Sequence, residues 1–203
     1  MRIHVRWIAL FLMVIALGNS ALTYASKDQY KTLKAPQSVP AFSLKDHAGN
    51  DFGLAQLQGQ WSLIFIGFTS CPDVCPLTLM QLEAVRADLG LRFTPERIPN
   101  IIFLAVDPAR DKSVLGKYLA HFHPENIGIT GEREQIDILV KGMDAFYRFS
   151  PKPGSDFYDV VHTAAIAVID PKAQLVSKIS PPFDINPMAE YLTQLIRQAK
   201  YHE

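Results

Sequence analysis

The sequence predicts one α/β domain, with a central mixed sheet flanked by helices and an N-terminal hairpin. Short apolar runs, typical of buried strands, alternate with longer segments whose apolar residues recur at helical spacing. The chain has 203 residues, enough for one well-cored domain after its N-terminal segment, and shows no internal repeat or low-complexity tract. Lysine plus arginine and aspartate plus glutamate both number 20, so no basic stripe indicates a nucleic-acid partner.

Residues 1–26 have the pattern of a targeting segment. Arg2 and Arg6 precede the uninterrupted apolar run Trp7–Leu17, and a small-residue region ends near Ala25. Because a spanning helix needs about 17 residues or more, we expect a signal peptide, with an uncleaved membrane anchor as the alternative. Either one predicts an exported domain. Residues 27–39 are polar and without periodicity, and are expected to be a tether to a domain over 40–203.

The elements expected along the domain follow a β-α-β unit and then a β-β-α unit. A hairpin is predicted at 39–44 and 51–54, strands at 61–68 and 100–106, helices at 76–89, 112–122 and 132–143, an edge strand at 145–149, a second hairpin at 164–169 and 174–179, and a closing helix at 186–200. With two cysteines placed directly after the first core strand, this order favours a thioredoxin-like fold.

Cys71 and Cys75 are the only cysteines of the chain, and they stand four residues apart between a strand and a helix. Proline suits the first helical position, so the helix is expected to begin near Pro76 with Cys75 as an N-cap-like residue. A helix start favours thiolate chemistry because its free N–H groups lower the pKa of a cysteine. If the turn is roughly helical, the two sulfurs lie close enough for a disulfide or for one soft metal ion. The spacing leaves redox and metal chemistry both open.

His162 is the histidine expected to join the cysteines. It ends a loop rich in Pro, Gly and Asp, ahead of the strand 164–169, and in a thioredoxin-like fold this connection lies beside the cysteine turn. The remaining histidines are expected to be solvated or to be dipole partners at a helix end: His4, His47, His121, His123 and His202. Two thiolates and one imidazole suit Cu(I) or Cu(II), whereas a structural zinc site would want a fourth protein ligand. Copper is therefore the expected metal.

Four stretches resemble the Sco/SenC family of thioredoxin-like copper-binding proteins that assist cytochrome c oxidase assembly. They are Gly67–Pro76 (GFTSCPDVCP), Val106–Asp111 (VDPARD), Ile129–Gly131 (ITG), and His162 ahead of an apolar strand. The resemblance implies that Cys71, Cys75 and His162 bind copper for delivery to an oxidase subunit carrying a copper site. It also implies a membrane-facing periplasmic location, usually with an N-terminal anchor.

The chain differs from many members of the family at one position: Val161 directly precedes His162, where they have an aspartate. Asp159, three residues upstream, is the nearest carboxylate that could orient the imidazole. Elsewhere, Asp73 is expected to cap the turn between the cysteines, and Asp107 and Arg110 to form an ion pair that holds a loop beside the site.

Two other functions use the same cysteines. In a thiol–disulfide oxidoreductase, one cysteine attacks a partner's disulfide and the other resolves the mixed intermediate. In a thiol peroxidase, a threonine three residues before the cysteine is expected, but Thr69 stands two residues before Cys71. The sequence therefore favours a copper chaperone, which is more a carrier than an enzyme, with the disulfide reductase as the alternative.

Overall fold

The computed structural model describes residues 29–154 and 157–199; the predicted targeting segment lies outside this part of the chain. Its strands are β1 (Tyr30–Ser38), β2 (Ser43–Asp46), β3 (Asp51–Gly53), β4 (Ser62–Gly67), β5 (Asn100–Ala105), β6 (Ile127–Thr130), β7 (Tyr147–Pro151), β8 (Tyr158–His162), β9 (Ile166–Ile169) and β10 (Gln174–Ile179). Its helices are α2 (Val74–Gly90), α3 (Pro108–Asp111), α4 (Leu115–Ala120), α5 (Arg133–Gly142) and α6 (Ile185–Ala199), with short 3₁₀ turns η1 (Leu54–Leu57) and η2 (Pro95–Arg97).

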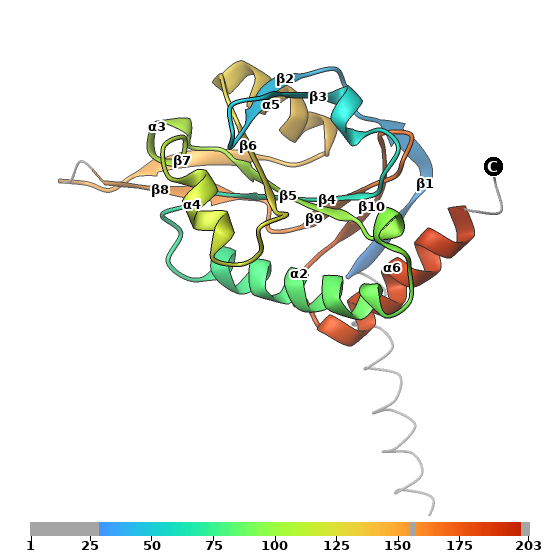
Figure 1. Ribbon diagram of the computed structural model, residues 1–203. Helices are drawn as coiled ribbons and strands as arrows, with labels where there is room; N and C mark the ends of the chain where they lie inside the picture. The colour runs from blue at the N-terminus through green and yellow to red at the C-terminus, as the bar shows by residue number, and fades with distance from the viewer. Residues whose placement is uncertain (1–28, 155–156, 200–203) are drawn as a thin grey trace, which may run out of the picture.

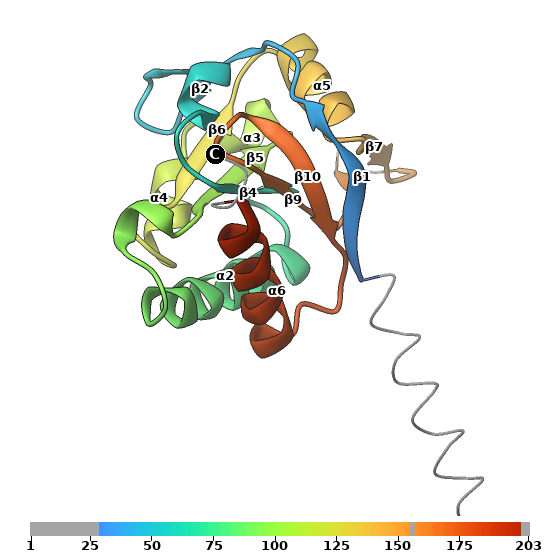
Figure 2. The ribbon, with the colours of Figure 1, turned by 90° about the vertical axis from the view of Figure 1, so that its right-hand side faces the viewer.

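One mixed sheet forms the centre of the domain, in the strand order β1-β10-β9-β4-β5-β6-β2-β3. The β4–β5 and β5–β6 pairs are parallel, and β9 runs antiparallel to β4. Helices α2 and α6 lie on one face of this sheet and α5 lies on the other (Figure 1), and the view turned by 90° agrees (Figure 2). Because both faces are covered, every residue of β4 is buried, which explains its continuous apolar sequence.

The observed architecture confirms the predicted thioredoxin-like class. The β4-α2-β5 unit and the β9-β10-α6 unit are both present, and β2 and β3 form the N-terminal hairpin. Strands β4 and β5 end side by side because they are parallel and in register, with Gly67 opposite Ala105. The loop that follows each of them, one carrying the cysteines and one carrying Asp107, therefore starts at the same edge of the sheet.

The structure differs from the sequence-based expectation in four places. Residues 30–38, within the predicted tether, form β1 and pair with β10, although most of their side chains are exposed and so show no periodicity. The predicted helix 112–122 is shorter, because only α4 (Leu115–Ala120) falls within it, and an unpredicted short helix, α3, precedes it. Strand β6 was not predicted. The edge strand β7 begins two residues late and pairs with an unpredicted strand, β8, in a separate two-stranded sheet. None of the helices over 29–154 and 157–199 has the length and hydrophobicity needed to cross a membrane.

Candidate metal centre

The two cysteines lie in the short loop and first helical turn that follow β4. The helix α2 begins at Val74, two residues earlier than predicted, so Cys75 lies inside its first turn. Pro76 is tolerated there because the first N–H groups of a helix have no intrahelical acceptor. Asp73 occupies the N-cap position, but its side chain makes no capping hydrogen bond. The Cys71 N–H donates to the carbonyl of Phe68 at 3.2 Å, which folds the loop back on itself.

Both cysteines are free thiols, and the Cys71 side chain lies close enough to Cys75 to affect its pKa. Cys75 is fully buried, and Cys71 is 8% exposed. Burial raises the pKa of Cys75, and the neighbouring Cys71 side chain raises it further. The prediction that the helix start lowers the pKa is therefore wrong for Cys75, because the loss of solvation outweighs the helix terminus. Burial thus favours the neutral thiol of Cys75.

Gly67 leaves room for the Cys75 sulfur at the end of β4. A Cβ atom at this position would lie 3.1 Å from the Cys75 sulfur and 2.6 Å from the Phe103 ring. Phe103 is completely buried in β5 and cannot move aside. The close packing therefore requires glycine at position 67, and it fixes the depth at which the sulfur lies.

Asp111, at the end of α3, holds the cysteine loop. Its Oδ1 atom accepts hydrogen bonds from the Thr69 N–H at 2.8 Å and from the Thr69 hydroxyl at 2.7 Å. Its Oδ2 atom accepts a third bond from the Asp107 N–H at 3.2 Å. The carboxylate is fully buried, and burial raises its pKa. The sequence singled out Asp107 and Arg110 in this motif but missed Asp111, whose role depends on a contact across 42 residues of sequence.

Asp107 joins the loop after β5 to strand β8. The predicted ion pair with Arg110 is confirmed, and the Tyr158 hydroxyl donates to both carboxylate oxygens at 3.0 and 2.9 Å. The Arg110 guanidinium lies 4.0 Å from the centre of the Tyr158 ring and 5.6 Å from that of Phe68. Arg110 thus packs between the strand that carries His162 and the loop that carries the cysteines.

His162 is the last residue of β8, rather than part of a loop as predicted. Alternation along β8 places it on the same face as Tyr158 and the buried Val160. Its ring meets Phe65 and Phe68 edge-on, with centroids 6.3 and 6.4 Å apart. Burial lowers the pKa of His162, which favours the neutral ring.

A backbone carbonyl selects the tautomer of the neutral His162 ring. Nδ1 lies 3.0 Å from the Thr163 carbonyl oxygen, which can only accept, so Nδ1 carries the proton. The lone pair is then on Nε2, the atom available to a metal ion. Asp159 does not orient this ring, because it lies on the opposite face of β8, where it pairs with Lys152 at 3.2 Å and is 61% exposed.

The described histidines other than His162 make contacts elsewhere. Nδ1 of His121 lies 2.6 Å from the Lys117 carbonyl at the end of α4, as expected for a partner of a helix C-terminus. His123 contacts Arg86, and His47 accepts a hydrogen bond from the Gly128 N–H at 3.1 Å. His4 and His202 lie outside the described residues.

The structure brings the two cysteine side chains close together, and His162 contacts Phe68 at the start of the cysteine loop. Over residues 29–154 and 157–199, no three His, Cys, Asp or Glu side chains are close enough to hold a metal ion as they stand. The chemistry of the donors nevertheless suits copper, because two adjacent sulfurs and an imidazole with a free Nε2 are soft and intermediate ligands. A three-ligand site requires His162 and the cysteine loop to approach each other.

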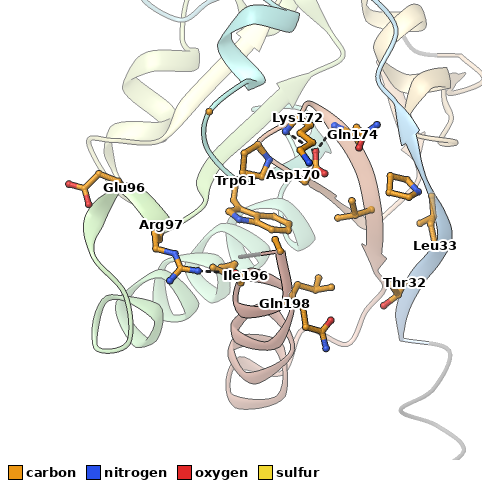
Figure 3. A pocket seen from close by; sticks show the side chains of 16 residues that line it. Thr32, Leu33, Trp61, Glu96, Arg97, Asp170, Lys172, Gln174, Ile196 and Gln198 are labelled. Atoms are coloured by element: carbon orange, nitrogen blue, oxygen red, sulfur yellow. Dashed lines mark hydrogen bonds between the residues drawn. The ribbon is translucent and has the colours of Figure 1, made fainter. Parts of the chain in front are cut away.

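A cavity of about 720 Å³ lies at the other end of β4, away from the cysteines, and Figure 3 shows its lining. Trp61, whose indole ring lines the cavity, directly precedes the first residue of β4, whereas Cys71 lies in the loop after the last residue of that strand. The polar groups at this cavity already have partners nearby: Arg97 donates to the Ile196 carbonyl at 2.9 Å, and Asp170 accepts from its own turn. The cavity is separate from the metal centre.

The fold, with two neighbouring cysteines after a central strand, defines a protein of the thioredoxin-like class. Residues 30–197 match the family model described as SCO1/SenC, so the chain belongs to that family. It is 32% identical over 196 residues to the mitochondrial protein SCO1 of Saccharomyces cerevisiae, covering 87% of this chain but only 63% of the yeast protein. It is 30% identical over 185 residues to a putative copper-binding protein of Stutzerimonas stutzeri, covering 90% of this chain and 87% of that one.

Solved structures give the same assignment. The crystal structure of Arabidopsis thaliana ScoI with copper bound matches with a TM-score of 0.71 at 29% identity, covering 78% of this chain and 98% of that one. The crystal structure of yeast Sco1 with copper bound also gives 0.71, at 30% identity, covering 80% of this chain and 90% of that one.

Proposed function

We propose that this chain carries copper and delivers it to a cytochrome c oxidase subunit, with the thiolates of Cys71 and Cys75 and the imidazole of His162 as ligands. The observation that carries the proposal is the pair of neighbouring buried thiols, together with an imidazole that contacts Phe68 of the same loop and keeps Nε2 free. The copper-bound structures of two relatives support the choice of metal. Thiolates prefer Cu(I), so the carrier form requires the reduced pair.

Copper binding must displace protons from the two sulfurs. Burial keeps Cys75 protonated in the free protein, so the metal competes with protons and its affinity weakens as the pH falls. His162 enters this competition at less cost, because burial already favours its neutral form. The hydrogen bonds from Thr69 to Asp111 hold the loop while His162 approaches.

A copper titration tests this function. The chain from about Ser26 onward is reduced and titrated with Cu(I) against a competing chelator, beside Cys71→Ser, Cys75→Ser and His162→Ala variants. We expect a single copper per chain, lost in each cysteine variant and weakened without His162. His47→Ala is the matched control, because that ring accepts a hydrogen bond from the Gly128 N–H and does not line the cavity beside the cysteine loop. Undiminished binding by His162→Ala would contradict the three-ligand site.

The second candidate is a thiol–disulfide oxidoreductase that keeps a partner's cysteines reduced. The four-residue spacing of Cys71 and Cys75 and the proximity of their side chains favour it, because such a pair can form a disulfide after small adjustments. Turnover of a model disulfide without copper binding would favour this function over the carrier.

Export is part of the proposal, with the domain in the periplasm, either soluble or tethered to the inner membrane. It is supported by Arg2 and Arg6 ahead of the apolar run Trp7–Leu17. Fractionation of cells that make the full chain, with N-terminal sequencing of the product, tests export and cleavage together.

A further inference from the structure

A tyrosine hydroxyl lies buried and without a hydrogen-bond partner next to the metal centre. Tyr118 is on α4, and its ring packs against Phe103 at 5.7 Å and Phe122 at 5.4 Å between centroids. Among the described residues, its hydroxyl oxygen has no hydrogen-bond partner, and it is shielded from solvent. A buried hydroxyl in this condition destabilises the fold, so it calls for an explanation.

Tyr118 is close to the cysteines on more than one side. With Thr69 and Ser70 of the cysteine loop, it lines a cavity of about 530 Å³. The Phe103 ring, against which it packs, is also the ring that borders the Gly67–Cys75 contact. Burial raises the pKa of Tyr118, and electrostatic interaction with Cys75 and then with Cys71 raises it further. Its phenol therefore stays protonated and remains a hydrogen-bond donor.

Building on the proposed copper function, we infer that the Tyr118 hydroxyl is a positioning residue that donates a hydrogen bond to the Cys75 sulfur once that sulfur is a metal-bound thiolate. In the free protein the hydroxyl makes no hydrogen bond to either sulfur, so the bond forms only when the site takes up the metal. A sulfur carrying negative charge is a much stronger acceptor than a neutral thiol. The hydroxyl would stabilise the loaded site without binding the metal itself.

The alternative is that Tyr118 only fills space beside Phe103. A matched control separates the two readings, because Tyr30 also has a buried hydroxyl without a partner, but at β1, on the outer strand of the sheet. Tyr118→Phe and Tyr30→Phe remove the same group from similar surroundings. Only the first removes a donor beside the cysteine loop.

The test compares Cu(I) affinity and the Cu(II) spectrum of the wild type, Tyr118→Phe and Tyr30→Phe. We expect Tyr118→Phe to bind Cu(I) about tenfold more weakly or worse, since loss of a group supporting a ligand costs about 10- to 100-fold in metal affinity. The sulfur-to-Cu(II) charge-transfer band should move to longer wavelength, because an unbonded thiolate gives up electrons more easily. Thermal stability should not fall in either variant, and Tyr30→Phe should leave affinity and spectrum unchanged.

Three results are decisive. If the wild type binds copper through its cysteines and Tyr118→Phe matches it in affinity and spectrum, the role of Tyr118 is refuted while the copper function stands. Equal losses in both tyrosine variants would also refute it, because the effect would then be structural. If the wild type shows no cysteine-dependent copper binding, the proposed function fails, and the hydrogen bond to a metal-bound sulfur fails with it.

Discussion

Replacing Tyr158 by phenylalanine removes the hydrogen bond that ties the His162 strand to the loop after β5. The Tyr158 hydroxyl is bonded to both carboxylate oxygens of Asp107, at 3.0 and 2.9 Å, and Asp107 is only 1% exposed. A hydrogen bond to a charged group contributes about 1.5–3 kcal/mol. Because Tyr158 is partly exposed and water can replace it, we expect the lower end, about 1.5 kcal/mol. The stacking of Arg110 on the ring remains in the variant.

Chemical denaturation of Tyr158→Phe should show this loss of unfolding free energy, and Cu(I) affinity should fall because His162 is held less firmly. In a His162→Ala background, the same substitution should leave Cu(I) affinity unchanged, since the strand then carries no ligand. Tyr191→Phe is the control: its hydroxyl bonds Thr32 and Ser177, each at 2.6 Å, on other strands. An equal drop in affinity with and without His162 would refute the link between Asp107 and the imidazole.

Three further substitutions or conditions have defined outcomes. Gly67→Ala should lower the unfolding free energy by about 1–3 kcal/mol, because the new methyl group overlaps the Phe103 ring and presses on the Cys75 sulfur; a variant as stable as wild type in urea would contradict this. Because burial lowers the pKa of His162, the unfolded chain binds the imidazole proton more tightly than the folded chain does. The unfolding free energy should therefore fall as the pH drops through the folded-state pKa of His162. His162→Gln should flatten that part of the plot of unfolding free energy against pH. Asp159→Asn should leave Cu(I) affinity within about twofold of wild type, since a surface ion pair contributes little and this carboxylate faces away from the ring.

The sequence predicts the core of the fold because its strands are buried on both faces. The apolar runs of β4 and β5 and the amphipathic α6 are unambiguous, and they place Cys71 and Cys75 correctly at the sheet edge. Strand β8 was missed because only Val160 of its five residues is buried and it pairs with β7 alone. Two valines, Val160 and Val161, stand side by side in its sequence, so apolar and polar residues do not alternate and the segment resembles a loop.

The contacts around the site could not be predicted, because they join distant segments. Asp111 holds Thr69, and Tyr118 reaches the cysteine loop from another helix, and neither has a local sequence signal. The pKa of Cys75 could not be predicted from its position at the start of a helix alone. Its place in the first turn of a helix favours the thiolate, but its depth in the core reverses the shift.

X-ray absorption at the copper edge of the reduced chain, loaded with a single equivalent of Cu(I), tests the central claim most directly. Our account predicts two sulfur donors and one nitrogen donor per copper in the wild type. In His162→Ala, the nitrogen donor should disappear while the sulfurs remain. A nitrogen donor that persists in His162→Ala, or a wild-type spectrum with sulfur donors alone, would contradict the assignment of Cys71, Cys75 and His162 as the copper ligands.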